Sequence, residues 1–417
     1  MLLTKFVATV LLDQKKFMDA YTRCREVLSQ LGEEIPESLQ SNQMFVIVNA
    51  TSKILKDISD SDLLEMKEMD ERLGISIAFY NIMAQAACFG KPKMIPFLTC
   101  KMVQLTMKNG ICKYSIMGFV MYASMLCTGK IANKDIEDAL RIGKAAMNCS
   151  KKRYHTTEQL SNLYLVYYGY IAFHTEPLQS CADMLRQGFD VGMSLGETGI
   201  AFFNSEQHVK IAFMSGVRLP TLLEKVDYYL KLANAYQNEI VEVFLSVHRE
   251  TISILMDRGG SSSTPYAVDV PTDTANERVL GMIYYHRAIR AYWQGHNERC
   301  QHYIKKLSPH SVNYDSWRLL FITFIDGMNS FQLLKRTSNS KLGSLPRYDN
   351  KLRSIPEKAI EELKTAASHS SLNFSNKVRY NQTLFDAVLF FSCSTHDISK
   401  FFPPSFAILI SGPSVTS

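Results

Sequence analysis

The chain has 417 residues, of which 46% are hydrophobic and 21% charged, so wholesale disorder is excluded and a large buried core is possible. The net charge of +6 is only mildly basic and lacks the clustering typical of nucleic-acid-binding proteins, so we predict no nucleic-acid partner. With 20 glycines and 13 prolines, the chain has few breakers for its length, which favours long helices over an all-β fold.

The cysteines and the hydropathy pattern indicate the compartment. The nine cysteines include no C-x-x-C pair, and most lie in apolar segments of helical character. This pattern favours reduced, buried thiols in a cytosolic protein. No apolar run reaches the roughly 18–20 residues that a membrane-spanning helix needs. We therefore predict a cytoplasmic protein without a membrane partner.

The first segment, residues 2–12, is apolar but lacks the features of a signal peptide. A lysine and two threonines interrupt it, a charged stretch follows at residues 13–16, and no small-residue cleavage site is present. We interpret this segment as the second half of a helix, so that the chain begins inside a repeat.

Two breaks follow before residue 70. Residues 32–36 (GEEIP) are expected to end a helix, because glycine and proline are typical just past a helix end. In the acidic turn at residues 57–62, Ser59, Asp60 and Ser61 offer N-cap oxygens for a helix over residues 62–69.

The dominant pattern along the chain is a series of about fifteen segments of helical periodicity, each roughly 12–20 residues long. A weak repeat is visible among them: residues 138–143 (DALRIG) resemble residues 183–188 (DMLRQG), 45 residues later, and residues 224–229 (EKVDYY) follow about 41 residues after that. Each motif is predicted to begin the second helix of a pair. A period near 40 residues with two helices is typical of a helical solenoid.

Aromatic-rich segments supply the predicted first helices of these pairs and of two further pairs. They span residues 119–126, 163–173, 202–214, 243–256 and 279–293. The expected breaks after them lie at residues 129, 176–177, 216–220, 259–260 and 295.

The C-terminal half also contains two predicted surface loops, at residues 259–271 and 337–356, both rich in turn residues. Residues 401–417 show no helical period. We therefore predict a helical repeat domain over residues 1–390 and an irregular tail over residues 391–417.

Sequence motifs for catalysis are scarce. The chain has no phosphate-binding loop, no dinucleotide-binding glycine motif, no kinase triplet and no H-E-x-x-H zinc motif. Residues 192–196 (GMSLG) match the G-x-S-x-G pattern, in which Ser194 would be the nucleophile. That motif needs a strand before the serine, whereas residues 182–191 have helical character, so we interpret the glycines as a helix stop.

We also interpret the histidines, the tyrosines and the charge clusters as structural residues rather than as parts of a functional site. His286 is predicted to be a hydrogen-bonded core residue, His174 to lie at a helix end, and His296 and His302 have no recognised ligand spacing. The tyrosines of residues 164–170 have no interleaved basic residue, which favours core packing over base stacking. The basic residues 151–153 and the acidic residues of 57–71 are interpreted as solvated, with an anion or partner contact as the alternative for the basic cluster. We predict no catalytic residue, no metal ligand and no cofactor.

Several stretches in order carry a resemblance to a known family. They are residues 101–106 (KMVQLT) with 109–110 (NG), 169–174 (GYIAFH) with 176–178 (EPL), Gly188, 196–199 (GETG), 291–295 (AYWQG), 326–327 (DG) and 372–377 (LNFSNK). Together they resemble the tetratricopeptide-like helical repeat region of large multidomain signalling ATPases. In that family a protein-kinase-like domain and an AAA-type ATPase domain precede the repeats, and a GAF domain with a histidine kinase or nucleotide cyclase often follows.

The resemblance covers about residues 1–390 and implies an all-α fold, a right-handed superhelix of stacked antiparallel helix pairs. The family's catalytic residues lie outside this region, so none is carried over. The resemblance implies a gene fragment, a degenerate relic or a stand-alone repeat protein.

We predict a non-catalytic module for protein interaction, or a spacer, in signal transduction. Its partner would be a protein or peptide, or the sister domains of a longer chain. Two alternatives stay open: an enzyme, either a hydrolase using Ser194 or an all-α enzyme with dispersed residues, and a regulatory module that senses a small ligand in the solenoid groove.

Overall fold

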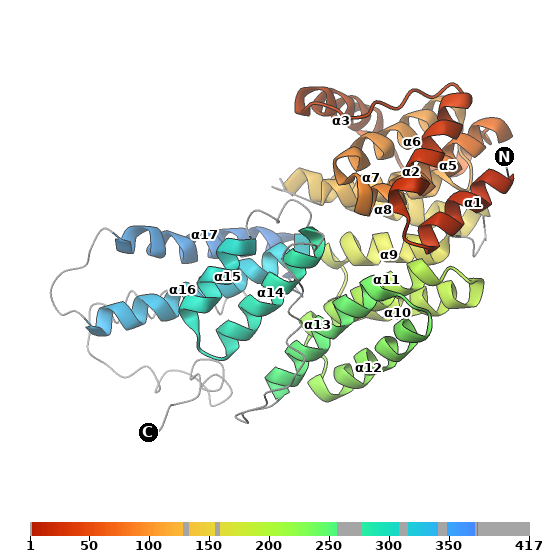
Figure 1. Ribbon diagram of the computed structural model, residues 1–417. Helices are drawn as coiled ribbons and strands as arrows, with labels where there is room; N and C mark the ends of the chain where they lie inside the picture. The colour runs from red at the N-terminus through yellow and green to blue at the C-terminus, as the bar shows by residue number, and fades with distance from the viewer. Residues whose placement is uncertain are drawn as a thin grey trace. The chain divides into compact units, whose positions relative to one another are not determined.

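A computed structural model describes residues 2–127, 133–154, 159–256, 277–307, 316–340, 348–371 and 373. Across these residues the regular structure is helical and no β-strand is present (Figure 1). One isolated parallel bridge joins Glu68 to Ile111, where the Met69 amide donates a 2.9 Å hydrogen bond to the Ile111 carbonyl. The prediction of an all-α fold is confirmed.

The chain divides into two compact units. The first comprises Met1–Phe173 with Ser180–His208, and the second comprises His174–Gln179 with Val209–Ser417. The predicted boundary between a repeat domain over residues 1–390 and a tail over residues 391–417 lies outside the described residues. So do the predicted breaks at residues 129 and 259–260, the loop at residues 259–271 and the segment 401–417.

The first unit begins with nine α-helices and extends into two more. Some of these helices pack on their neighbours in the sequence, for example α6 on α7 and α7 on α8, whereas α2 packs on α5 across two intervening helices. The described helices of this unit are α1 (Leu2–Asp13), α2 (Phe17–Gln30), α3 (Ser41–Leu55), α4 (Asp60–Glu65), α5 (Glu71–Gly90), α6 (Ile95–Asn109), α7 (Ser115–Leu126), α8 (Asn133–Cys149) and α9 (Leu160–Tyr170). Two more helices, α10 (Leu178–Leu195) and α11 (Thr198–Ser215), each have residues in both units. Short 3-10 and π turns lie at Pro92–Met94, Ala172–His174 and Ser150–Tyr154.

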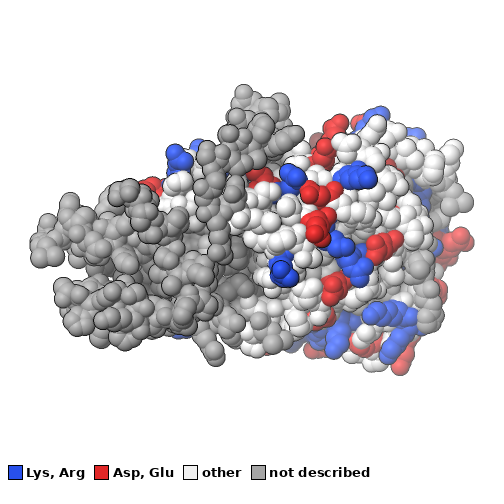
Figure 2. All heavy atoms as spheres, turned by 90° about the horizontal axis from the view of Figure 1, so that it is seen from below, with Lys and Arg blue, Asp and Glu red and all other residues white. Residues whose placement is uncertain are grey.

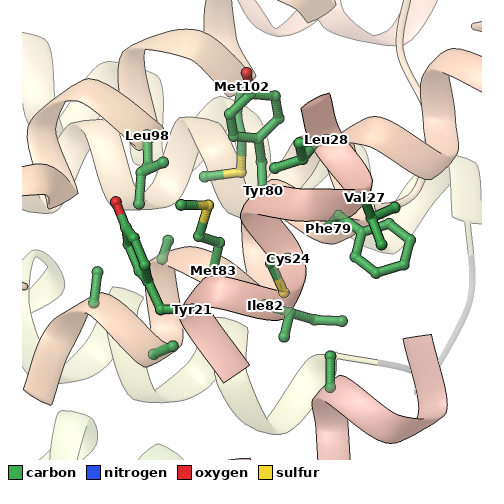
Figure 3. Packing of buried hydrophobic residues seen from close by; sticks show 14 of the residues in the cluster. Tyr21, Cys24, Val27, Leu28, Phe79, Tyr80, Ile82, Met83, Leu98 and Met102 are labelled. Carbon is green, nitrogen blue, oxygen red and sulfur yellow. The ribbon is translucent and has the colours of Figure 1, made fainter. Parts of the chain in front are cut away.

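The core of the first unit forms around α5, as Figure 3 shows. Phe79, Tyr80 and Met83 of this helix are fully buried and meet side chains of α2 and α6. The hydroxyl of Tyr80 donates a 2.9 Å hydrogen bond to the Glu33 carboxylate. A helix enclosed on most sides is apolar all round, which explains why α5 has no polar face.

This enclosure also bears on the membrane prediction. An 18-residue window of α5 is long and apolar enough to cross a membrane by length and composition, a match that the search for apolar runs missed because isolated polar residues interrupt it. In the structure 67% of that window is buried inside the protein. A buried core helix passes the same test, so the match is weak evidence for a membrane span.

The helix ends agree with the predicted breaks, with one correction. Gly32, with φ +88°, follows the end of α2, and residues 216–218 separate α11 from the next helix. Ser59 caps α4 as predicted, forming reciprocal bonds with Asp62 in a capping box. The helix then ends at Glu65 rather than at residue 69, because residues 67–69 turn into extended backbone and pair with Ile111.

The weak repeat corresponds to three real helices. Helices α8, α10 and α12 begin at Asn133, Leu178 and Leu219, 45 and then 41 residues apart. Each motif starts five residues into its helix rather than at its first residue.

The last position of each motif is a packing position. A Cβ on Gly143 would lie 3.2 Å from the ring of Tyr167 in α9, and one on Gly188 would overlap Asn204 Oδ1 in α11. The third motif carries Tyr229 there, which is 2% exposed. The last position of each motif therefore marks a closely packed position on α8, α10 or α12.

The second unit contains the remaining helices, again packed mainly on their neighbours in the sequence. They are α12 (Leu219–Ala235), α13 (Glu239–Met256), α14 (Glu277–Trp293), α15 (Asn297–Leu307), α16 (Ser316–Ser340) and α17 (Tyr348–His369). Asn329 of α16 donates a 3.1 Å bond to the carbonyl of Asn297, the first residue of α15.

The predicted loop at residues 337–356 is wrong at both ends. Residues 337–340 complete α16, residues 348–356 belong to α17, and residues 341–347 lie outside the described part. Pro356 is buried inside α17, a position where proline normally weakens a helix. Burial of Ala359, Ile360 and Leu363 on the same helix, which packs on α16, outweighs that local cost.

Two stretches that carry the family resemblance meet in this unit. The side-chain oxygen of Asn373 accepts a 3.1 Å bond from the Leu178 amide, and its nitrogen donates a 2.8 Å bond to the Glu176 carbonyl. Asn373 thus holds the turn at residues 176–177 and the start of α10.

Replacing Gly188 by alanine should destabilise the first unit by about 1–3 kcal/mol, because the added methyl overlaps Asn204 and lies 3.1 Å from the Cβ of Tyr164. Gly199→Ala is the matched control: it is also helical, but its nearest neighbour is Asp13 Oδ1 at 3.4 Å. Alanine should be neutral or stabilising there. Urea unfolding followed by circular dichroism measures both, and equal stability of the two variants would contradict the account.

Asp326 should make the second unit less stable as the pH rises from about 4 to 6. Burial raises the pKa of this carboxyl to about 6, and a hydrogen bond from Gln301 offsets only part of that effect. The folded state therefore holds the proton more tightly than the unfolded chain does, and this contribution is lost above the folded pKa. Asp326→Asn should flatten the pH profile and raise stability at pH 7 by about 3 kcal/mol at most. The control is the exposed Glu357→Gln, and an unchanged profile in Asp326→Asn would contradict this reading.

Candidate functional site

A partly enclosed groove of about 340 Å³ lies in the second unit, between α13, α14 and α15. Three arginines, Arg287, Arg290 and Arg299, line it together with a single acidic residue, Glu250. Val247, Ile254, Ile283, Ala291, Gln294, His296 and Tyr303 complete the lining. The groove is therefore lined by both apolar and charged side chains, with arginine the predominant charged residue.

One ion pair joins two of the three helices at this groove. Arg290 Nη1 of α14 lies 2.5 Å from Glu250 Oε1 of α13, and the two side chains are 13% and 17% exposed. A charge-assisted pair with so little exposure fixes both side chains in place. Next to it, the Arg287 guanidinium lies 6.0 Å from the centre of the Tyr303 ring on α15. The groove is thus held by contacts from all three helices.

A buried histidine pair joins α13 to α14, two of the helices that line the groove. The rings of His248 and His286 meet edge to face at 4.3 Å, and both residues are 1% exposed. His286 Nδ1 is 3.0 Å from the Thr251 hydroxyl, so the predicted core role of His286 is confirmed. Sequence analysis missed His248 because the pairing of α13 with α14 depends on the fold.

The other histidines do not form a metal centre in the described part of the chain, where no group of three His, Cys, Asp or Glu side chains is arranged to hold a metal ion. His296 lines the groove, whereas His302 packs on Tyr303. His174 is buried, and burial lowers its pKa to about 3, which keeps the ring neutral at physiological pH.

The G-x-S-x-G match lies at a helix end, as interpreted from the sequence. Ser194 is in the last turn of α10, where its hydroxyl donates a 2.8 Å bond to the Val191 carbonyl. Gly196 follows with φ +75°, the conformation that ends helices. Ser194 is therefore on a helix C-terminus and not on the strand-to-helix turn that activates such a nucleophile.

The buried cysteines are poor nucleophiles. Cys24, Cys100, Cys127, Cys149 and Cys300 are buried free thiols, and Cys393 lies outside the described residues. Burial raises the pKa of Cys24 and of Cys127 to about 12 and that of Cys149 to about 11. These thiols stay protonated at neutral pH, whereas the thiolate is the reactive form.

The aromatic stretch of α9 packs in the core, as predicted. Tyr164, Tyr167 and Tyr168 are buried and meet edge to face at 5.0–5.5 Å. Tyr170 is half-buried, and its hydroxyl accepts a 3.1 Å bond from Gln207.

The interpretation of the basic residues 151–153 as solvated is wrong for one of the three. Lys151 and Lys152 are exposed, but Arg153 donates bonds to the carbonyls of Leu63 (3.3 Å), Leu64 (3.1 Å) and Met66 (2.6 Å) at the end of α4 and a 2.6 Å bond to Glu68. Arg141 does the same for α3, donating to the carbonyls of Leu55 and Ile58 and to Asp138. Both arginines therefore satisfy helix C-termini, which local sequence could not reveal because their partners lie more than 80 residues away.

Two short helices of the first unit expose large apolar side chains. On α1, Leu3, Phe6 and Val7 are 75%, 66% and 37% exposed and share one helical face by their spacing. On α3, Phe45 and Val46 are each 66% exposed. Elsewhere, acidic and basic side chains alternate over the described part of the face in Figure 2, without a large patch of one sign.

Comparisons with family models, curated proteins and solved structures find no match for this chain.

Arg153→Ala should destabilise the first unit by about 1–3 kcal/mol, because it leaves the carbonyls at the end of α4 without their charged donor. Lys152→Ala, one residue away and exposed, should change stability by less than about 0.5 kcal/mol. Thermal unfolding of both variants measures the difference, and a loss of stability in Lys152→Ala as large as that in Arg153→Ala would refute the capping role.

Proposed function

We propose that this chain is a tetratricopeptide-like α-solenoid of stacked antiparallel helix pairs. Two observations support this architecture: helices α8, α10 and α12 recur at intervals of 45 and 41 residues, and most helices pack on their neighbours in the sequence. A helix pair of this kind cannot bury its apolar face alone and needs its neighbours to do so.

We further propose a non-catalytic role, as a protein-interaction or spacer module in cytoplasmic signal transduction, related to the repeat region of multidomain signalling ATPases. The observation that carries the interaction role is the exposed apolar face of α1, where Leu3 and Phe6 are among the most exposed large apolar side chains described. Exposed apolar surface of this kind is typical of interaction sites. The partner would be a protein or peptide, or the sister domains of a longer chain.

Two other functions remain as alternatives. The groove of the second unit favours a ligand-sensing regulatory module, since it combines an apolar wall with convergent polar groups. An all-α enzyme with dispersed residues has less support, because Ser194 is placed on a helix end and the buried thiols are protonated.

The interaction role is tested by pull-down with the purified chain and with Leu3→Ser/Phe6→Ser. We expect a partner that binds the native chain and is lost, by at least about tenfold in affinity, from the double variant, because both side chains are solvent-exposed and their replacement removes contact area without opening the core. Tyr228→Ser, which removes an exposed aromatic side chain (52% exposed) on α12, should bind normally.

A partner that binds the double variant as tightly as the native chain would contradict a role for α1. If no stable partner is found, the spacer role is left, and X-ray scattering should then show an elongated particle. A mostly β circular dichroism spectrum would overturn the fold itself.

A further inference from the structure

Helix α15 buries little apolar surface. Cys300 and Leu307 are its buried apolar residues, and the third buried residue is the polar Asn297. Most of its other residues are exposed. Local opening of a helix costs little free energy when few apolar contacts are broken, so α15 is an element that can separate from its neighbours while the rest of the unit stays folded.

Hydrogen-bonded amides and one carboxyl group join α15 to α16. Asn329 of α16 donates to the Asn297 carbonyl at 3.1 Å and to Gln301 Oε1 at 3.4 Å. The Gln301 amide in turn donates to Asp326 Oδ1 at 3.3 Å. The Asn297 amide donates to Gln332 Oε1 at 2.9 Å. Of these five side chains, Asp326 is the one that can ionise, so its charge bears directly on the contact between the two helices.

Burial is the main influence on Asp326, whose pKa it raises to about 6. The Gln301 hydrogen bond acts against burial, as do the charges of Lys305 on α15 and Lys358 on α17. Glu362 of α17 raises the pKa of Asp326 instead, and it lies 3.7 Å from Lys358, so α17 adds little net charge at this carboxyl.

Two further titratable groups lie close to this contact. Burial raises the pKa of the Cys300 thiol on α15 and that of the Tyr292 hydroxyl on α14 well above their ordinary values. Both groups stay protonated at neutral pH. Of these three groups, only Asp326 therefore changes its charge below pH 7.

We propose that α15 is a proton-linked flap at the groove between α13, α14 and α15. While Asp326 is protonated, α15 stays on α16; when Asp326 is ionised, hydration of the carboxylate favours the release of α15. Because His296, Arg299 and Tyr303 line the groove from α15 and the residue before it, release of this helix opens the groove. The proposal is independent of the interaction role, which rests on α1 of the other unit.

The direction and size of the effect follow from proton linkage. The closed helix raises the pKa of Asp326 to about 6, whereas the carboxyl of the released segment has its ordinary pKa of 3.8. The closed state therefore holds the proton more tightly, and its advantage is lost as the pH rises to the higher pKa. From these two values, the equilibrium constant for opening should increase about tenfold between pH 5 and pH 7.

Amide hydrogen exchange of the full chain, measured by mass spectrometry at pH 5 and pH 7, tests the proposal. After correction for the intrinsic pH dependence of exchange, the protection of the α15 amides should be about tenfold lower at pH 7. At both pH values it should also be at least about tenfold lower than that of the α12 amides, which report on opening of the whole unit.

Two variants assign the effect to one carboxyl group. Asp326→Asn cannot ionise, so the protection of α15 should become independent of pH. Glu357→Gln, which removes an exposed carboxyl group from α17, should keep the pH dependence of the native chain. The native chain alone decides the test if Asp326→Asn does not fold, because the comparison of α15 with α12 needs no variant.

Protection of α15 equal to that of α12 would show that only the whole unit opens, and would overturn the proposal. So would protection of α15 that is independent of pH in the native chain, or that changes with pH as strongly in Asp326→Asn as in the native chain.

Discussion

The close approach of α10 to its neighbours at Gly188 is the contact on which the repeat packing depends. The Ser161 hydroxyl of α9 donates a 2.8 Å bond to the Gly188 carbonyl, and Asn204 of α11 donates to the carbonyl of Ser161 at 2.9 Å. Three helices are therefore joined at one residue, and the missing side chain of Gly188 makes room for the Asn204 amide. The Ser161 hydroxyl and the Asn204 amide nitrogen are tolerated there because they bond to one another and to the backbone.

A related arrangement recurs in the second unit and leads to its groove. Asn329 of α16 donates to the carbonyl of Asn297, which fixes the start of α15 beside Arg299. The ion pair between Glu250 and Arg290 joins α13 to α14 on the other side. The groove between α13, α14 and α15 thus follows from helix packing, since the same contacts that order the helices also hold its charged residues in place. In both units, buried asparagines bond to the backbone near a helix start and so define how neighbouring helices meet.

Much of the fold could be predicted from the sequence because helices and their ends are local. Periodicity located α7, α9, α11, α13 and α14, and glycine marked breaks such as the one at Gly216, although residues 219–220 of the predicted break belong to α12. The prediction failed where distant contacts override local signals: Pro356 lies inside α17 because that helix packs on α16, and Arg153 caps α4 from 87 residues away. The groove was not predictable, because its arginines become neighbours only when α13, α14 and α15 pack together; His296 was noticed but had no visible partner.

A double-mutant cycle between Gly188 and Asn204 tests the central packing contact most directly. The single variants Gly188→Ala and Asn204→Ala and the double variant are compared in free energy of unfolding. Shortening Asn204 removes the group that the new methyl would overlap, so the double variant should be at least about 1 kcal/mol more stable than the sum of the single effects predicts. Strictly additive effects, within about 0.3 kcal/mol, would show that the two helices do not meet at this residue and would contradict the account.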